Sequence, residues 1–224
     1  MIVGEHKPIP ELLSAIEGLD TILMVGCKGC VSVCNAGGSK EVAILAAALR
    51  IARKKQGKPV VIDELMLDRQ CEPEFIEWLS EPVSKKKYDA VMSLACGIGP
   101  QYIAEAFPGV RVLPGLNTSF MGGTLTHGIW AEYCSACGAC GVGNFGGLCP
   151  VTRCAKGLLN GPCDGSVDGM CEADPETECV WEKIYERLQS LGETDKLDRA
   201  CAPKDRSVSL SGGPRKIVRE DLTL

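Results

Sequence analysis

Short apolar runs alternate with amphipathic stretches in the first half of the chain. The compact runs are rich in valine, isoleucine and leucine, which predicts buried strands. We expect these strands at residues 21–25, 58–62, 90–94 and 110–113. Helical spacing of the apolar residues predicts helices over 8–19, from Ser39 through Ile51, and over 73–79 and 101–107. Strands separated by helices predict βαβ units, and hence an α/β fold with an open, mostly parallel, Rossmann-like sheet.

The pattern changes near residue 124. Eight of the 14 cysteines fall between Cys134 and Cys179, among many glycines and with almost no periodic apolar residues. Such a segment has too few apolar side chains for a core of its own, so we expect bound metal to replace that core. The spacing of Val180, Ile184 and Leu188 then predicts a helix.

These changes divide the chain into three parts. Residues 1–123 form the predicted α/β domain, and residues 124–191 form a small metal-binding domain with little regular structure before its final helix. Residues 192–224 are a polar tail with a short predicted strand at 215–218, and they are a candidate arm for docking a partner.

Composition and charge exclude several classes of protein. The chain has 24 basic and 29 acidic residues among 224, which argues against a nucleic-acid binder. No apolar run approaches the ~18 residues of a membrane span, and residues 1–8 lack a secretory leader pattern. We therefore expect a cytoplasmic chain with reduced thiols, in which many cysteines indicate metal or redox chemistry. With only two histidines, histidine-based catalysis is not expected.

The strongest motif places three cysteines at successive spacings of three, followed by a Cys-Pro pair. These residues are Cys134, Cys137, Cys140 and Cys149. Closely spaced thiolates followed by Cys-Pro are typical of bacterial iron–sulfur proteins, although the fourth cysteine lies farther away than in a ferredoxin. Structural zinc, which usually takes two separated CxxC pairs, is the alternative.

A second group of cysteines follows at wide spacings, at Cys154, Cys163, Cys171 and Cys179. Glycines and a proline between them indicate short loops that return to a common point. Together with the first four, they are enough ligands for two four-ligand centres, or for one cluster and one zinc ion. The order along the chain does not assign ligands to sites.

The α/β domain contains a third group. Cys27, Cys30 and Cys34 follow the first predicted strand, and Cys96 follows the third. Both places lie at the carboxyl edge of a parallel sheet, where ligands of open α/β proteins bind. We expect these four cysteines to hold a cluster, with buried apolar thiols as the alternative for Cys30 and Cys34. Two cysteines remain, Cys71 and Cys201, and both are interpreted as passive thiols.

Several of these motifs resemble a known family. The segments that carry the resemblance are Cys149-Pro-Val-Thr-Arg-Cys154, Gly161-Pro-Cys163-Asp-Gly-Ser, Gly169-Met-Cys171-Glu and Cys179-Val-Trp181-Glu, with Cys134, Cys137 and Cys140 upstream. They closely resemble the methylenetetrahydrofolate reductase C-terminal domain family. Val25-Gly-Cys27 and Ala36-Gly-Gly38 look like the rest of the small cysteine-rich subunit that accompanies the flavin-containing reductase in acetogens. One departure is Asp164, where the family usually has glycine.

The resemblance implies an electron-transfer subunit rather than the reductase itself. It implies a flavin-containing catalytic partner with a barrel fold and an upstream electron donor. The twelve candidate ligands are enough for up to three [4Fe-4S] clusters, or for zinc in place of one of them. The residues agree, because the chain has redox ligands but no evident flavin motif and no acid–base set. A zinc-stapled docking subunit of the same complex is the main alternative, and an enzyme with a zinc-activated thiolate is a weaker one.

Overall fold

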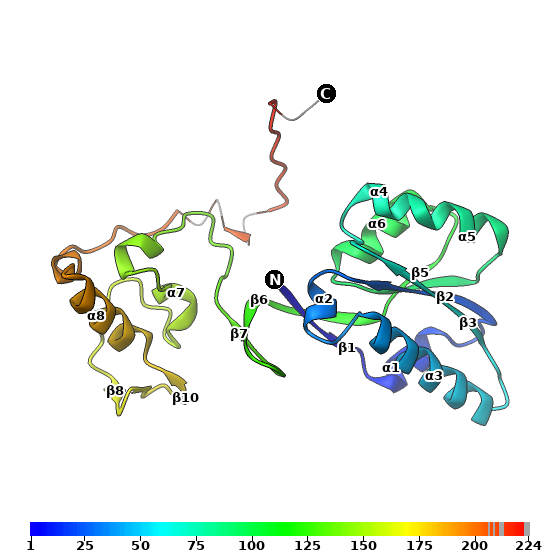
Figure 1. The fold of residues 1–224 in the computed structure, drawn as a ribbon, viewed down its shortest axis with the longest axis horizontal. Coiled ribbons are helices and arrows are strands. Elements are labelled where there is room, and N and C mark those ends of the chain that lie inside the picture. The colour runs from blue at the N-terminus through cyan, green and yellow to red at the C-terminus, as the bar shows by residue number, and fades with distance from the viewer. Residues whose placement is uncertain (206, 208, 211–212, 222–224) are drawn as a thin grey trace. The chain divides into compact units, whose positions relative to one another are not determined.

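The computed structural model describes residues 1–205, 207, 209–210 and 213–221. The chain forms two compact units, Met1–Trp130 and Ala131–Leu224 (Figure 1). The sequence pattern changes a few residues earlier, because strand β6 (Leu116–Thr126) and the start of β7 (Ile129–Glu132) still belong to the first unit.

A four-stranded parallel sheet organises the first unit. Its strands lie in the order β3-β2-β4-β5, with β3 at Val61–Leu67, β2 at Thr21–Cys27, β4 at Ala90–Leu94 and β5 at Val112–Pro114. All neighbouring pairs are parallel. The predicted α/β class is therefore confirmed, and the carboxyl ends of all four strands share one edge.

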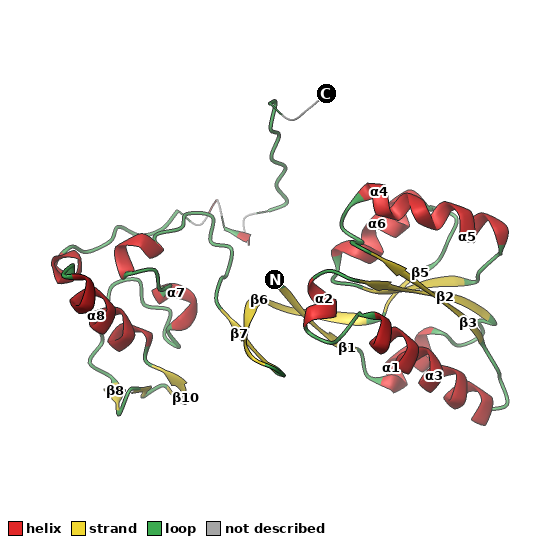
Figure 2. Cartoon of the chain, in the orientation of Figure 1, coloured by secondary structure: helices red, strands yellow, loops and turns green. Residues whose placement is uncertain are grey.

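Helices cover both faces of this sheet, as Figure 2 shows. One face carries α1 (Ile9–Ala15) and α3 (Ser39–Lys55). The other carries α4 (Pro73–Ile76), the 3-10 turn Glu77–Leu79, α5 (Ser80–Lys85) and α6 (Ile98–Ala106). Along β2, Ile22 and Met24 enter the core beneath α1 and α3, whereas Leu23 and Val25 enter the core beneath α4 and α6. This alternation explains the continuous apolar run, because a strand buried on both faces needs no polar positions.

The buried face of helix α3 differs from the predicted apolar face near the carboxyl end of the helix. Ile51 is 58% exposed, and Arg53 instead lies on the buried face with Leu49. The helix starts at Ser39, and no side-chain hydrogen bond caps it. Arginine can occupy such a position because its long aliphatic stem packs against apolar neighbours.

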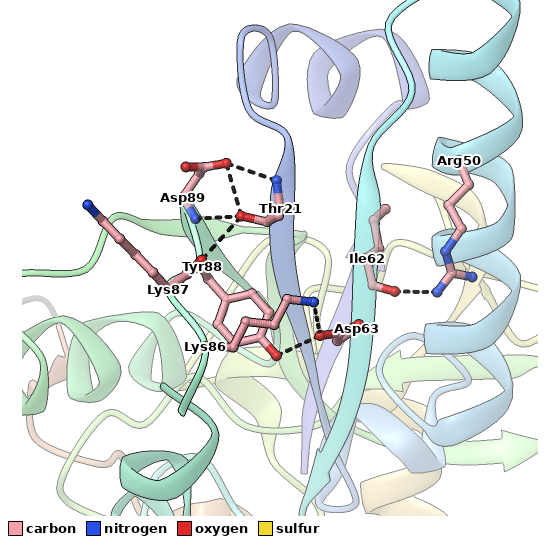
Figure 3. A network of polar contacts seen from close by, with 8 residues as sticks. All are labelled: Thr21, Arg50, Ile62, Asp63, Lys86, Lys87, Tyr88 and Asp89. Atoms are coloured by element: carbon pink, nitrogen blue, oxygen red, sulfur yellow. Dashed lines mark hydrogen bonds and ion pairs between the residues drawn. The ribbon is translucent and has the colours of Figure 1, made fainter. Parts of the chain in front are cut away.

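Polar contacts tie the strands together at the opposite, amino-terminal edge of the sheet (Figure 3). The Asp89 carboxylate accepts hydrogen bonds from the backbone N–H and the hydroxyl of Thr21, at 2.8 and 3.0 Å. The Asp63 carboxylate accepts from Lys86 at 2.6 Å and from the Tyr88 hydroxyl at 2.7 Å. These contacts hold the starts of β2, β3 and β4 in register.

A second sheet in the first unit was not predicted from the sequence. It is antiparallel, in the order β1-β6-β7, with β1 at Ile2–His6. The short β1 has only two fully buried residues, Val3 and Gly4, so its hydrophobic pattern is too brief to identify a strand. Strand β1 pairs with β6, which lies at the other end of the first unit in the sequence, so local patterns do not predict this contact.

The second unit has short elements and a small apolar core. The elements are a 3-10 turn at Val142–Phe145, α7 (Pro150–Arg153), the three-stranded sheet of β8 (Ser166–Val167), β9 (Met170–Cys171) and β10 (Asp174–Glu178), α8 (Val180–Leu191) and a 3-10 turn at Thr194–Asp198. Helix α8 confirms the predicted final helix. It contributes Val180, Trp181, Ile184 and Leu188 to a core with Phe145, which is the one fully buried member of this core from the segment between Cys134 and Cys179.

Two further predictions from the sequence concern a strand at 215–218 and the lack of a membrane-spanning segment. The strand predicted at 215–218 is wrong, because these residues have no regular structure. Among the residues that the structure describes, no helix combines the length and apolarity needed to cross a membrane.

Candidate metal centres

Four of the predicted ligands line one cavity in the second unit. Cys134, Cys137, Cys140 and Cys149 surround a space of about 370 Å³, together with apolar residues such as Val142 and Phe145. Among the residues that the structure describes, no histidine or carboxylate lines this cavity. We call it the four-cysteine cavity. The structure thus brings together the set that the sequence motif singled out.

The backbone around the four-cysteine cavity is tightly turned. Ala136 has φ of +49°, a left-handed conformation that is rare for residues other than glycine. Its N–H donates to Cys134 Sγ at 3.4 Å, and its carbonyl oxygen accepts from the backbone N–H of Leu210 at 2.9 Å. Strained residues of this kind gather at binding sites, where the surrounding contacts maintain them. Here the contacts hold the loop in a turn with one N–H directed at a thiol.

Helix α7 holds the fourth cysteine against this loop. Cys149 immediately precedes the helix, and its Sγ lies 3.6 Å from Thr152 Oγ1. The Thr152 hydroxyl in turn donates to Ser135 Oγ at 3.2 Å. Side-chain contacts therefore join α7 to the cysteine loop that precedes it.

Lys204, in the predicted tail, also lines the four-cysteine cavity. Its Nζ donates to Cys137 Sγ at 3.3 Å and to the carbonyl oxygen of Ala139. The ammonium group lowers the pKa of Cys137, chiefly through this hydrogen bond. Sequence reasoning missed Lys204, because 67 positions separate it from Cys137 and no local motif marks it.

The start of the tail is fixed to the second unit at a further point. The Asn160 side chain donates to the Cys201 carbonyl oxygen at 2.9 Å and accepts from its N–H at 2.8 Å. Cys201 itself packs against the core of α8. Residues 201–204 are thus part of this unit's fold.

The remaining four predicted ligands are more dispersed. Cys163 and Cys179 line a second cavity of about 520 Å³. Cys171 is buried in β9, and Cys154 follows α7 and packs against the α8 core. The Lys156 ammonium lies 3.5 Å from Cys163 Sγ and forms an ion pair with Glu172, and both contacts raise the pKa of Lys156, with Glu172 as the main cause. Only two of the four cysteines therefore share a described cavity.

Asp164, the departure from the family pattern, has φ of +59°. Glycine adopts this left-handed conformation without a steric penalty, and aspartate tolerates it better than most residues. The conformation explains why glycine is suited to this position, and why the aspartate leaves the loop with Cys163 intact.

In the first unit, predicted ligands lie at the carboxyl edge of the parallel sheet. Cys27 ends β2, and Cys96 follows β4, which ends at Leu94. Cys30 is exposed and begins α2 (Cys30–Val33). Gly37 allows this loop to pass close to the end of β4, because a Cβ at this position would lie 2.2 Å from the Leu94 carbonyl oxygen.

Cys34 is buried in the same core cluster as Cys27 and contacts β1. It is 6% exposed, and its Sγ accepts from the Gly4 N–H at 3.4 Å. Its thiol also lies 3.6 Å from the carbonyl oxygens of Gly4 and Val31. Cys34 therefore contacts β1 and the core beneath α3.

Cys71, interpreted as a passive thiol, lies near this edge. Burial raises the pKa of Cys71, and the charges of the Cys27 and Cys96 thiolates raise it further. The turn that holds Cys71 follows β3 and is joined to the loop after Cys27, because the Lys28 N–H donates to the Leu67 carbonyl oxygen at 2.9 Å.

All fourteen cysteines lie within the described residues, and each is a free thiol. Across those residues, no group of three cysteine, histidine, aspartate or glutamate side chains forms a closed metal-ligand set. The donor chemistry of the four-cysteine cavity fits a group bound by four thiolates, with an ammonium and a backbone N–H to offset their negative charge.

Comparisons with known proteins identify a family for part of the chain. Residues 113–207 match the family described as "Methylene-tetrahydrofolate reductase C terminal". No curated protein and no solved structure matches the chain. The matched segment includes the four-cysteine cavity, Lys204 and α8.

Proposed function

We propose, from the match of residues 113–207 to the methylene-tetrahydrofolate reductase C-terminal family, that the chain is an iron–sulfur electron-transfer subunit of a methylenetetrahydrofolate reductase complex. The observation that carries this proposal is the four-cysteine cavity, where Cys134, Cys137, Cys140 and Cys149 surround one space within the matched segment. The family places the chain with the reductase, and the thiols indicate what it contributes to the complex.

The size of the four-cysteine cavity and its four thiol donors favour an iron–sulfur cluster over a single metal ion. Its volume of about 370 Å³ is more than ten times the ~30 Å³ share of one water molecule in the liquid. Four cysteines are also the usual ligand set of a [4Fe-4S] cluster, which supplies one-electron redox chemistry when bound. The four thiolates would hold the cluster, and the apolar lining would limit access of water to it.

Other residues would set how readily an electron is accepted. The Lys204 ammonium beside Cys137 and the Ala136 N–H at Cys134 Sγ both stabilise added negative charge. Hydrogen bonds to cluster sulfurs and nearby positive charge raise the reduction potential. The chain's own contribution is therefore to bind the cluster and to bias its potential.

The proposed complex has two further components. A flavin-containing catalytic subunit with a barrel fold would receive the electrons and reduce the folate substrate, and an upstream donor protein would supply them. The proposal places the chain in the cytoplasm of acetogens and related anaerobes, within one-carbon metabolism by the reductive acetyl-CoA route. Up to three [4Fe-4S] clusters, with zinc in place of one, would use ligands from the three groups of cysteines.

Metal analysis of anaerobically purified chain tests this proposal. We expect iron and acid-labile sulfide in equal amounts, visible sulfide-to-iron absorption, and a paramagnetic signal after reduction. Cys140→Ser should remove the content of one cluster, whereas Cys201→Ser, at a cysteine outside the predicted ligand set, should keep it. Chain without iron and sulfide would contradict the proposal.

A zinc-stapled docking subunit of the same complex is the second candidate. The small size of the core beneath α8 favours it, because five buried side chains give the second unit little stability without a metal. Stoichiometric zinc in colourless, partner-binding chain would support this candidate. Zinc together with iron would indicate that one centre has a structural role.

A further inference from the structure

Three neighbouring strands of the parallel sheet each lead to a cysteine at the same edge. Cys27 ends β2, Cys71 lies in the turn after β3, and Cys96 lies in the turn after β4. The sheet order β3-β2-β4 places these strands side by side. The carboxyl edge of a parallel sheet is where α/β proteins bind their ligands.

A buried glutamine fixes the turn that carries Cys71. The Gln70 side chain is 1% exposed, and its amide N–H groups donate to the carbonyl oxygens of Val25 and Gly26 at 2.9 and 3.1 Å. Its amide oxygen accepts from the Ser93 hydroxyl at 2.6 Å. One side chain thus bonds the turn after β3 to both β2 and β4. The position of Cys71 is therefore set by the sheet.

The turns after β2 and β3 are also joined directly. The Lys28 N–H donates to the Leu67 carbonyl oxygen at 2.9 Å, and the Lys28 ammonium pairs with Asp68 at 2.7 Å. A Cβ on Gly29 would lie 3.4 Å from Cys27 Sγ and 3.9 Å from the Asp68 carbonyl oxygen. The Cys27 thiol therefore lies on the side of its loop that faces the turn of Cys71.

Cys34 and Cys27 are both buried, at 6% and 7% exposed, and both belong to the core beneath α1 and α3, but the polar partners of Cys34 lie on β1 and α2. The Cys34 sulfur accepts one backbone N–H and lies within reach of two carbonyl oxygens, all inside the core. A buried thiol with such contacts behaves as a small apolar residue. Turning it to the edge would break its contact with β1 and leave a void in the core.

We propose that Cys27, Cys30, Cys71 and Cys96 form a four-thiolate site for an iron–sulfur cluster at the carboxyl edge of the parallel sheet, and that Cys34 is a core thiol without a metal. Cys30 completes the set, because it is exposed and follows Cys27 in a CxxC spacing. The site lies outside the family match, which begins at residue 113. The choice of an iron–sulfur cluster rests on the proposed function, whereas the choice of ligands rests on the geometry of this edge and, for Cys30, on its CxxC spacing and exposure.

Metal and sulfide analysis of full-length variants tests the ligand set. In anaerobically purified chain, Cys71→Ser should lower the bound metal by the content of one centre. Cys34→Ala and the matched control Cys201→Ala should keep the wild-type content. Circular dichroism should show that each variant is folded.

Alkylation of the unmodified chain gives a second readout that requires no variant. Cys71 is exposed, yet bound metal should protect it from iodoacetamide until a chelator removes the metal, as peptide mass spectrometry would show. Cys34 should stay protected for as long as the sheet is folded.

The outcomes separate the two proposals. Loss of a metal centre from folded Cys34→Ala, full metal content in Cys71→Ser, or alkylation of Cys71 in metal-loaded chain would each overturn the ligand set. If Cys71→Ser removes zinc instead of iron, the ligand set stands and the redox role of this centre fails.

Discussion

A single ammonium group lies against the cysteine loop of the second unit. Lys204 donates to Cys137 Sγ at 3.3 Å and lowers the pKa of that thiol. The same positive charge favours the reduced, more negative state of a cluster bound at the four-cysteine cavity. Although it lies in the predicted tail, Lys204 acts as a positioning residue for this centre.

Replacing Lys204 should therefore change the reduction potential without removing the cluster. We expect Lys204→Met to shift the midpoint potential by roughly 50 mV to more negative values, which is about 1 kcal/mol for one electron. Lys204→Arg should largely keep the wild-type potential because it keeps the charge. Redox titration followed by electron paramagnetic resonance checks this, and equal potentials in all three chains would contradict it.

Tyr88 gives a pH-dependent prediction at the other edge of the sheet. Burial raises the pKa of Tyr88 to about 12, and the Asp63 carboxylate contributes to this rise. Folding therefore favours the neutral phenol, so its contribution to stability is complete below the unfolded pKa of about 10 and is lost as the pH rises towards 12. Asp63 has a lowered pKa, chiefly through Lys86, so its contribution is lost at acidic pH instead.

Absorbance titration of the folded chain measures the Tyr88 shift. One of the four tyrosines should ionise near pH 12, and Tyr88→Phe should remove that step. Asp63→Asn should move the step to lower pH, because it removes a negative charge next to the phenol. An unchanged titration in Asp63→Asn would show that the carboxylate has no influence.

At the scale of elements, short turns between strands and helices carry the chemistry of the first unit. The predicted strand at 90–94 is confirmed as β4, and the predicted strands and helices around it are found with shifted boundaries. Periodicity suffices for these elements because a strand buried between two helical layers needs a continuous apolar run. The turn at residues 68–72 has no such signal, and a buried glutamine fixes its conformation.

Gln70 should consequently be important for stability. Gln70→Ala leaves the Ser93 hydroxyl and the carbonyl oxygens at the end of β2 without this partner, and we expect a loss of about 2–3 kcal/mol in the free energy of unfolding. The matched control is Gln101→Ala, which removes an exposed hydrogen bond to the Gly97 carbonyl oxygen and should cost about 0.5 kcal/mol. Urea unfolding of both variants measures the difference, and equal losses would contradict the structural role of Gln70.

At the scale of the whole molecule, the two units differ in what stabilises them. The first has an apolar core on each face of its sheet, whereas the second has a single core of five fully buried apolar residues. Small domains with so little core usually depend on metal or disulfides. Each of the fourteen cysteines is a free thiol, which leaves metal as the expected source of stability.

Removing metal should therefore unfold the second unit selectively. After treatment with a chelator, the amides of α8 should exchange with deuterium quickly, while those of β2 and β4 stay protected. Hydrogen exchange measured by mass spectrometry compares both units in one sample. Protection of α8 in metal-free chain would show that its small core suffices.

The sequence by itself determined the α/β class and the position of α8, and it singled out Cys134, Cys137, Cys140 and Cys149 as one motif. These features follow from local patterns, namely periodic burial and ligand spacing within one loop. Only the tertiary structure decided the pairing of β1 with β6, the approach of Lys204 to Cys137 and the contact of Cys34 with β1. Each of these depends on contacts between residues far apart in the chain, which local spacing does not encode.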